Sequence, residues 1–168
     1  MAYTLDELSS IAEIRTLQAR YCRGVDRMDP DILRSVYWED AQDDHGVFRG
    51  HREAFIEWVM PVLRDRFAQI QHVLGQTYTE LDGDTAHSET YFVQHSLRPD
   101  GVAYSSPGRY IDRLERRDGE WRVADRIALM TFFYPTEVAD TEKMASSGFR
   151  PGTRDRTDPA YFGRATVV

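Results

Sequence analysis

The feature of the sequence that most limits its fold is a series of four long segments between residues 70 and 134, in which apolar and polar residues alternate. Alternation with a period of two is typical of β-strands that bury one face. Short turn sequences rich in Asp and Gly separate the segments, and such tight turns join neighbouring antiparallel strands. The pattern therefore predicts an antiparallel meander. Its strands are expected at residues 70–81, 85–97, 102–117 and 120–134.

The residues before the meander predict helices. The first segment carries apolar side chains at steps of three and four, as expected for a helix that packs one stripe on a core. Thr4 and Glu7 match a capping box at its start. In the third segment, Pro61 predicts a kink or a break into two pieces. The expected helices are residues 4–25, a short helix that begins at Asp29-Pro30, and about 51–67.

The connection between the second and third helices is rich in carboxylates, which predict a solvated loop that leads into a short strand. Gly46 and Gly50 enclose residues 47–49, which predict a short hairpin arm. Helices followed by a meander indicate the α+β class, with helices packed on one face of a curved sheet. The carboxylates of the predicted loop are Glu39, Asp40, Asp43 and Asp44.

Composition limits the class of protein. With 168 residues the chain has the size of one domain with a real core, and its net charge of −7 makes nucleic acid an unfavourable partner. No segment approaches the ~20 apolar residues that a membrane span needs, and no apolar signal core is found at the N-terminus. We therefore expect a cytoplasmic protein. Cys22 is interpreted as a small core residue rather than a nucleophile.

Tyr21 and Asp26 are the first candidate site residues. Both fall on or beside the apolar stripe of the first helix. A phenol or a carboxylate that faces a core needs a hydrogen-bond partner or a polar cavity, so these residues point to a site. The alternative for Asp26 is that it ends this helix or caps the next one, because Gly24 and Asp29-Pro30 show that the helix ends there.

His72 is the third candidate. It alternates with Ile70 and Leu74 on the first long strand, which predicts that its ring faces the core. A histidine in this place is commonly structural. A carboxylate such as Asp26 bound to one ring nitrogen would, however, fix the tautomer and leave the other nitrogen basic. We therefore consider an Asp26–His72 pair that abstracts a proton.

Arg126 is the fourth candidate. Alternation from Trp121 and Val123 places it on the face opposite the core, where it would be an ordinary surface residue. Only a bulge in the strand would turn it inward. Asp112 on the neighbouring strand is a possible ion-pair partner in either case. The remaining histidines lack metal-ligand spacing, and no phosphate loop or dinucleotide fingerprint is found, so neither a metal nor a cofactor is expected.

Several short motifs, in this order, resemble the SnoaL-like group of the nuclear-transport-factor-like cone fold. The resemblance covers roughly residues 5–135. It implies a cone-shaped α+β barrel around an apolar pocket without cofactor, and a dimer or trimer. The motifs are Tyr21-x4-Asp26, Trp38 and Asp40, the helix with Pro61, His72, Glu115-Arg116-Arg117-Asp118-Gly119-x-Trp121, and Phe133-Tyr134-Pro135.

Within that group, the pattern looks most like hexachlorocyclohexane dehydrochlorinase, scytalone dehydratase and bile-acid 7α-dehydratase. The resemblance implies that Asp26 and His72 serve catalysis, with His72 as base, and that Arg126 reaches the cavity. Tyr21 stands where the dehydrochlorinase has a lysine and the bile-acid enzyme a tyrosine. This departure favours an oxygen leaving group over chloride.

These observations predict a cofactor-independent lyase of the dehydratase type that acts on an apolar cyclic molecule such as a sterol or polyketide. The alternatives are an isomerase or cyclase with the same base, and a non-catalytic ligand-binding or oxygenase small-subunit-like module. The expected organisation is a SnoaL-like domain at residues 1–135 and an extension at 136–168 that serves as a lid or an oligomer contact.

Overall fold

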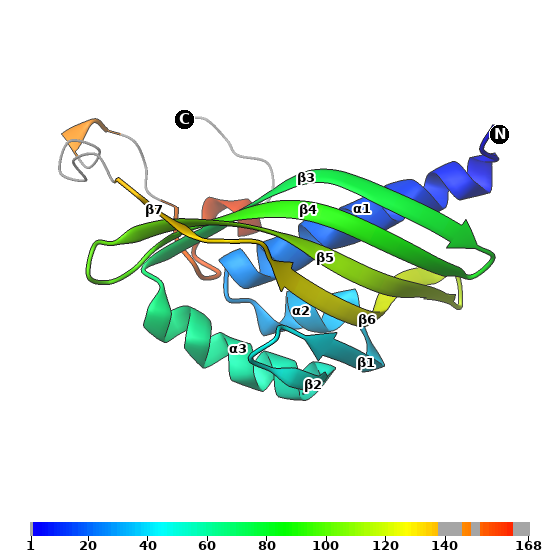
Figure 1. Ribbon diagram of the computed structural model, residues 1–168, viewed down its shortest axis with the longest axis horizontal. Coiled ribbons are helices and arrows are strands. Elements are labelled where there is room, and N and C mark those ends of the chain that lie inside the picture. The colour runs from blue at the N-terminus through cyan, green and yellow to red at the C-terminus, as the bar shows by residue number, and fades with distance from the viewer. Residues whose placement is uncertain (1, 138–145, 149–151, 163–168) are drawn as a thin grey trace.

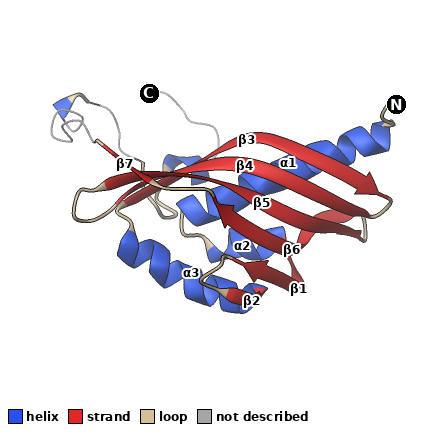
Figure 2. Cartoon of the chain, viewed as in Figure 1, coloured by secondary structure: helices blue, strands red, loops and turns tan. Residues whose placement is uncertain are grey.

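The computed structural model describes residues 2–137, 146–148 and 152–162 of the chain. Three helices pack on one side of a curved sheet, so the predicted α+β class is confirmed (Figure 1). Figure 2 shows the strands as one continuous layer with the helices gathered behind and below it. None of the helices in these ranges combines the length and apolar composition that a membrane span requires.

The predicted meander forms the main part of the sheet. The strand order is β2-β1-β6-β5-β4-β3, and β7 pairs beside β5. Because β2 and β3 are free edges of this path, the cone is open rather than a closed barrel. The meander consists of β3 (Gln69–Asp82), β4 (Thr85–Leu97), β5 (Ala103–Arg117) and β6 (Glu120–Met130).

Glycines make the tight turns of the meander possible. Gly83 and Gly119 have φ angles of 58° and 81°, a region that residues with a side chain rarely adopt. The two turns join β3 to β4 and β5 to β6 with only two residues each. The sequence signal for the meander was therefore local, and it predicted the strand pairing correctly.

The predicted solvated loop at residues 39–44 is wrong. The segment is a strand, β1 (Tyr37–Asp44), which pairs in parallel with β6 and antiparallel with β2 (Arg49–His51). Tyr37, Ala41 and Asp43 are buried, and Asp43 is only 2% exposed. The Tyr37 hydroxyl donates to Asp43 Oδ2 at 2.7 Å and so compensates part of the cost of burying the carboxylate.

The helix predictions hold with two corrections. In α1 (Leu5–Asp26) the Thr4 capping box is present, but Leu5 and Leu8 are 87% and 49% exposed because the first turns extend beyond the core (Figure 1). The third helix, α3 (Arg52–Arg66), is not divided at Pro61. Between them lies α2 (Pro30–Val36), with Asp29 as its N-cap.

The last predicted strand, at residues 120–134, is interrupted. β6 ends at Met130, and β7 (Tyr134–Thr136) resumes the pairing with β5 one residue out of register. Gly108 pairs with Met130 and Ser105 with Tyr134, so the three residues 131–133 lie opposite the two residues 106 and 107. Pro107 lies at this point and lacks the N–H that a continuous ladder requires.

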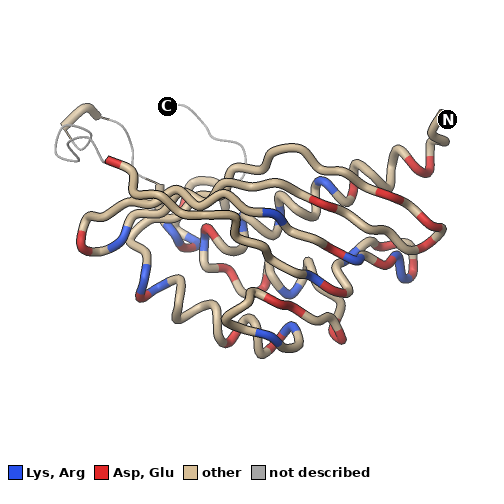
Figure 3. The backbone as a smooth tube through the Cα atoms, viewed as in Figure 1, with Lys and Arg blue, Asp and Glu red and all other residues tan. Residues whose placement is uncertain are grey.

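Acidic and basic residues lie interspersed along the strands and helices (Figure 3). Many of them form ion pairs across the outer face of the sheet, such as Arg109 with Glu89 and Arg113 with Asp125.

Part of the extension, residues 152–162, folds back on the N-terminal half of the same chain. There Arg156 contacts Asp29 and Asp31.

Candidate active site

A mostly apolar cavity of about 140 Å³ lies between the concave face of the sheet and the helices α1 and α3. Helix α3 and the strands contribute aliphatic and aromatic walls. The lining includes the side chains of Tyr21, His45, His72 and Gln94, and the largely apolar rings of Trp58 and Tyr110 carry one N–H and one hydroxyl group. The apolar lining residues are Val25, Trp58, Val59, Val62, Leu63, Phe67, Ile70, Phe92, Ala128 and Met130, together with the ring of Tyr110.

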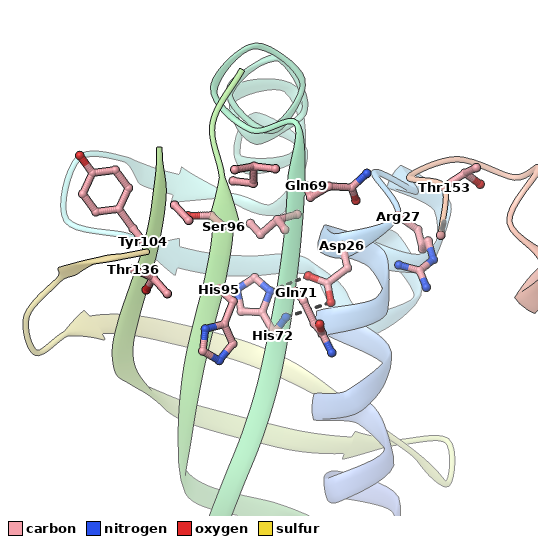
Figure 4. Close-up of a pocket in the computed structure, with 14 residues that line it drawn as sticks. Asp26, Arg27, Gln69, Gln71, His72, His95, Ser96, Tyr104, Thr136 and Thr153 are labelled. Atoms are coloured by element: carbon pink, nitrogen blue, oxygen red, sulfur yellow. Dashed lines mark hydrogen bonds and ion pairs between the residues drawn. The ribbon is translucent and has the colours of Figure 1, made fainter. Parts of the chain in front are cut away.

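Asp26 and His72 meet at one side of this cavity. Asp26 Oδ1 accepts from His72 Nδ1 at 2.7 Å, and Oδ2 accepts from the His72 backbone N–H at 3.0 Å (Figure 4). The two side chains are 12% and 5% exposed. Because the carboxylate holds Nδ1–H, it selects one tautomer and leaves Nε2 as the basic nitrogen of the ring.

Local structure explains why the pair forms. α1 ends directly after Asp26, since Met28 has a φ angle of 50° and the chain turns into α2. Asp29, and not Asp26, caps that helix through the N–H groups of Asp31 and Ile32. The carboxylate of Asp26 is thus free to reach β3, which passes over the end of α1 (Figure 4).

A second, more polar hollow of about 550 Å³ lies on the other side of the pair. Arg27, Gln69, Gln71 and His95 contribute to it, and it reaches both Asp26 and His72 (Figure 4). His72 lines the inner cavity as well, whereas Asp26 does not. The histidine therefore faces the apolar cavity, and its carboxylate partner lies behind it.

Tyr21 faces the same cavity from the middle of α1. Its hydroxyl oxygen lies within hydrogen-bond distance of His45 Nε2, at 3.2 Å, and the residue is 2% exposed. Burial raises the pKa of the Tyr21 hydroxyl well above its usual value, and the nearby Arg126 charge offsets this only in part. Tyr21 is therefore a neutral phenol that can donate a hydrogen bond.

Arg126 is turned inward by a bulge. Arg113 pairs with Asp125 and Leu114 with Val123, so β6 carries one extra residue just before Arg126. Arg126 is 1% exposed. The alternative of a surface arginine is therefore wrong.

The predicted partner of Arg126 is present as well. Its Nε and Nη2 donate to the two oxygens of Asp112, each at 2.7 Å. The guanidinium carbon lies 4.0 Å from the ring centroid of Tyr21 and 4.3 Å from that of Tyr110. Arg126 is not among the residues that line the cavity, so it contacts Tyr21 from behind and does not reach the position of a substrate.

The sequence reasoning missed His45 and Asp43. His45 Nδ1 contacts Asp43 Oδ1, and the His45 ring stacks on Phe55 with centroids 4.8 Å apart. The spacing Asp43-x-His45 is the signal that could have found them, because residues two apart share a face of a strand. Interpreting the segment as a loop concealed it.

Cys22 does not contribute a nucleophile. It is 5% exposed, and burial raises the pKa of its thiol to about 12. The thiol is thus protonated at neutral pH, in agreement with the interpretation as a core residue. Within residues 2–137, 146–148 and 152–162, no group of three or more His, Cys, Asp or Glu side chains has an arrangement that could hold a metal ion.

Known structures with the same architecture include dehydrochlorinases. LinA aligns with a TM-score of 0.74 and 25% identity, over 79% of this chain and 92% of LinA. The hexachlorocyclohexane dehydrochlorinase LinA-type3 from Novosphingobium barchaimii LL02 aligns with a TM-score of 0.73 and 24% identity, over 79% and 93%. A scytalone dehydratase candidate from Novosphingobium aromaticivorans DSM 12444 aligns with a TM-score of 0.68 and 18% identity, over 78% and 90%.

Sequence comparison agrees with this likeness of fold. No curated protein sequence matches the chain. The family model that describes the SnoaL-like domain, in contrast, matches residues 6–127, which is most of the chain. The protein therefore belongs to the SnoaL-like domain family.

Proposed function

We propose that the protein is a cofactor-independent lyase that removes water from a small, apolar, cyclic β-hydroxy ketone. The observation that carries this proposal is the bond between Asp26 and His72 Nδ1 at the wall of an apolar cavity. His72 Nε2 takes the proton from the carbon next to the carbonyl group. Asp26 fixes the tautomer and stabilises the imidazolium that forms.

Tyr21 is the proposed acid on the same cavity. As the carbon–oxygen bond breaks, the departing oxygen takes the phenolic proton and leaves as water. The products are a conjugated enone and water, and no electrons are exchanged with another molecule. Arg126 supports this step from behind, because its guanidinium, 4.0 Å from the ring centroid, stabilises negative charge that develops on Tyr21.

The size of the cavity narrows the substrate class. A cavity of about 150 Å³ holds one benzene ring, and the cavity here measures about 140 Å³. This supports a single six-membered ring as the reacting unit and argues against a whole sterol. LinA-type3, at 24% identity, is named for dehydrochlorination, whereas Tyr21 favours an oxygen leaving group. A comparison of substrates that lose water with substrates that lose chloride therefore tests which leaving group the site prefers.

The test uses 3-hydroxycyclohexanone and follows the absorbance of cyclohex-2-enone. We expect turnover by the wild-type protein and a loss of about 10²-fold or more in His72→Ala, because the base is removed. The matched control is His87→Gln on β4, where the side chain is exposed. Equal activity in wild type and His72→Ala would remove the basis of the proposal.

An isomerase or cyclase with the same base is the second candidate function. It rests on the same Asp26–His72 geometry and needs no leaving group. Mass spectrometry of the product separates the two, since a lyase lowers the mass by one water and an isomerase leaves it unchanged. A non-catalytic module does not require the two side chains within about 4 Å of each other. The observed 2.7 Å argues against it.

A homo-oligomer also remains a proposal. Four apolar side chains on the outer face of the sheet are 38–46% exposed, which supports a contact with another copy. Sedimentation at two protein concentrations would measure the mass directly, and a monomer at both would contradict it. The four side chains are Val73, Tyr91, Ile127 and Leu129.

A cytoplasmic location also remains a prediction.

A further inference from the structure

The cavity contains a second Asp–His pair, on the wall that lies across the sheet from His72. His45 directly follows β1, whereas His72 lies on the edge strand β3. Between β1 and β3 the sheet order places three other strands, and the curvature brings both histidines to one cavity. A cavity with a carboxylate-bound histidine on each of two walls has the groups for two proton transfers.

The surroundings of His45 determine what it can do. Nδ1 faces Asp43, whose other oxygen accepts from the Tyr37 hydroxyl at 2.7 Å. Nε2 faces the Tyr21 hydroxyl at 3.2 Å. Two aromatic side chains of α3, Phe55 and Trp58, lie beside the ring, with centroids 4.8 and 6.4 Å away. Asp44, next in the chain, is paired with Arg49.

The charge of His45 therefore decides the direction of one hydrogen bond. When His45 is neutral and Asp43 holds Nδ1–H, the bare Nε2 accepts a hydrogen bond from the Tyr21 hydroxyl, so the phenolic proton is directed at His45 and not at a bound substrate. When His45 is protonated, Nε2–H donates to Tyr21 Oη instead. The phenolic proton is then free to point into the cavity, toward a departing oxygen.

We propose that His45, oriented by Asp43, is the proton relay that supplies Tyr21. This rests on the proposed lyase function and adds its acid half. As the carbon–oxygen bond breaks, Tyr21 gives its proton to the departing oxygen and takes the proton from His45 Nε2. His45 ends neutral with Nδ1–H on Asp43. Its side chain is 21% exposed, so solvent returns the proton after each turnover.

Leaving-group dependence tests the relay. Loss of hydroxide from carbon requires a proton, whereas loss of chloride does not. The substrates are 3-hydroxycyclohexanone and 3-chlorocyclohexanone, which differ little in size. We expect His45→Gln to slow loss of water by about 10²-fold and to change loss of chloride by less than about threefold. Gln keeps a hydrogen-bonding group near Tyr21 but cannot carry the proton.

Three further variants complete the comparison. Tyr21→Phe, like His45→Gln, should slow the loss of water and leave the loss of chloride nearly unchanged. His72→Ala should slow both reactions, because both need the base, and His87→Gln should slow neither. A purely structural role of His45 would slow both reactions equally. That result, or an unchanged rate of water loss in His45→Gln, would overturn the relay.

A second measurement tests the relay from His45 to Tyr21 even if the wild-type protein acts on neither ketone. Nitrogen-15 NMR of the histidine rings reports which nitrogen carries the proton. We expect neutral His45 in the Nδ1–H form, a shift of its Nε2 signal in Tyr21→Phe, and the Nε2–H form in Asp43→Asn. An Nε2–H form in the wild type, or an Nε2 signal that ignores Tyr21→Phe, would rule out the relay whatever the fate of the lyase proposal.

Discussion

Asp26 uses both of its oxygens on the same residue, His72. One oxygen holds the ring and the other holds the backbone N–H. The carboxylate therefore determines both the tautomer of the ring and the position of β3 relative to α1. If only the charge of Asp26 is removed, by replacement with asparagine, activity should fall more than the free energy of unfolding. The amide has the same shape as the carboxylate and can keep the contact between α1 and β3.

Replacement of Asp26 by Asn is expected to lower kcat/KM for 3-hydroxycyclohexanone by about 10²-fold or more, because an amide N–H cannot accept from Nδ1 and favours the wrong tautomer. Steady-state rates and urea unfolding of the same samples measure both effects. Asp82→Asn, at the exposed last residue of β3, is the control. Unchanged turnover in Asp26→Asn would contradict a catalytic part for the pair.

The buried ion pair between Arg126 and Asp112 has an exposed counterpart one position along the same two strands. Arg113 and Asp125 are 39% and 43% exposed, whereas the Arg126 and Asp112 side chains are fully buried. Removing one partner of the buried pair leaves an unpaired charge in the core. The two pairs use the same residue types on the same two strands, and they differ in burial and in their neighbours, which are Gln18 for the buried pair and Glu115 for the exposed one.

We expect Asp112→Ala to lower the free energy of unfolding by about 3–5 kcal/mol. Asp125→Ala should cost about 1 kcal/mol or less, because solvent screens that pair. Urea unfolding curves at pH 7 with a common slope give both values. Equal losses in the two variants would show that Arg126 finds another partner when Asp112 is absent.

At the scale of elements, Asp29 joins α2 to the C-terminal segment 152–162. It caps α2 through Asp31 and Ile32, and it accepts from Tyr161 and Arg156 in the C-terminal segment 152–162. Burial alone would raise the pKa of the Asp29 carboxyl, but these donors outweigh it and hold the pKa below its usual value of 3.8. The extension is thereby connected to the helix that follows the candidate site.

The lowered pKa predicts a pH dependence of stability. Since the folded protein binds the proton less readily, the stabilisation by Asp29 is fully present above pH 3.8 and is lost as pH falls through the lower folded pKa. Asp29→Asn should therefore cost about 1 kcal/mol at pH 7 and almost nothing near pH 2. Urea unfolding at the two pH values measures the difference. Asp65→Asn, at an exposed aspartate on α3, is the control.

At the scale of the whole molecule, the open cone leaves one small apolar volume between sheet and helices. Its size depends on a few side chains from distant parts of the chain. Ala128 lines it from β6 and has the smallest side chain of the lining. A larger residue at this position would occupy the volume that we assign to the substrate.

Replacement of Ala128 by Leu should reduce kcat/KM for 3-hydroxycyclohexanone by at least about tenfold while leaving the free energy of unfolding within about 1 kcal/mol, because the added carbons fill empty space. Enone formation and urea unfolding test the two parts. Ile127→Leu, on the outer face of the same strand, is the control. If Ala128→Leu keeps full activity, the reaction does not take place in this cavity.

Local patterns were sufficient for much of this protein. The meander, the three helices, the cap at Asp29 and the inward faces of Asp26 and His72 follow from periodicity and turn residues, which act within a few positions of the chain. The roles of Tyr21, Asp26, His72 and Arg126 in catalysis remain predictions. The sequence alone thus determined the class of the fold and which faces of α1 and β3 point to the core.

Only the tertiary structure decided the rest. Asp43 is buried and His45 is partly buried because β1 pairs with β6, which is about eighty residues away in the sequence. Arg126 faces inward because a bulge lets it reach Asp112. Whether a charged side chain is solvated or buried depends on partners that are distant in the chain. Residue type and spacing do not contain that information, and folding brings the partners together.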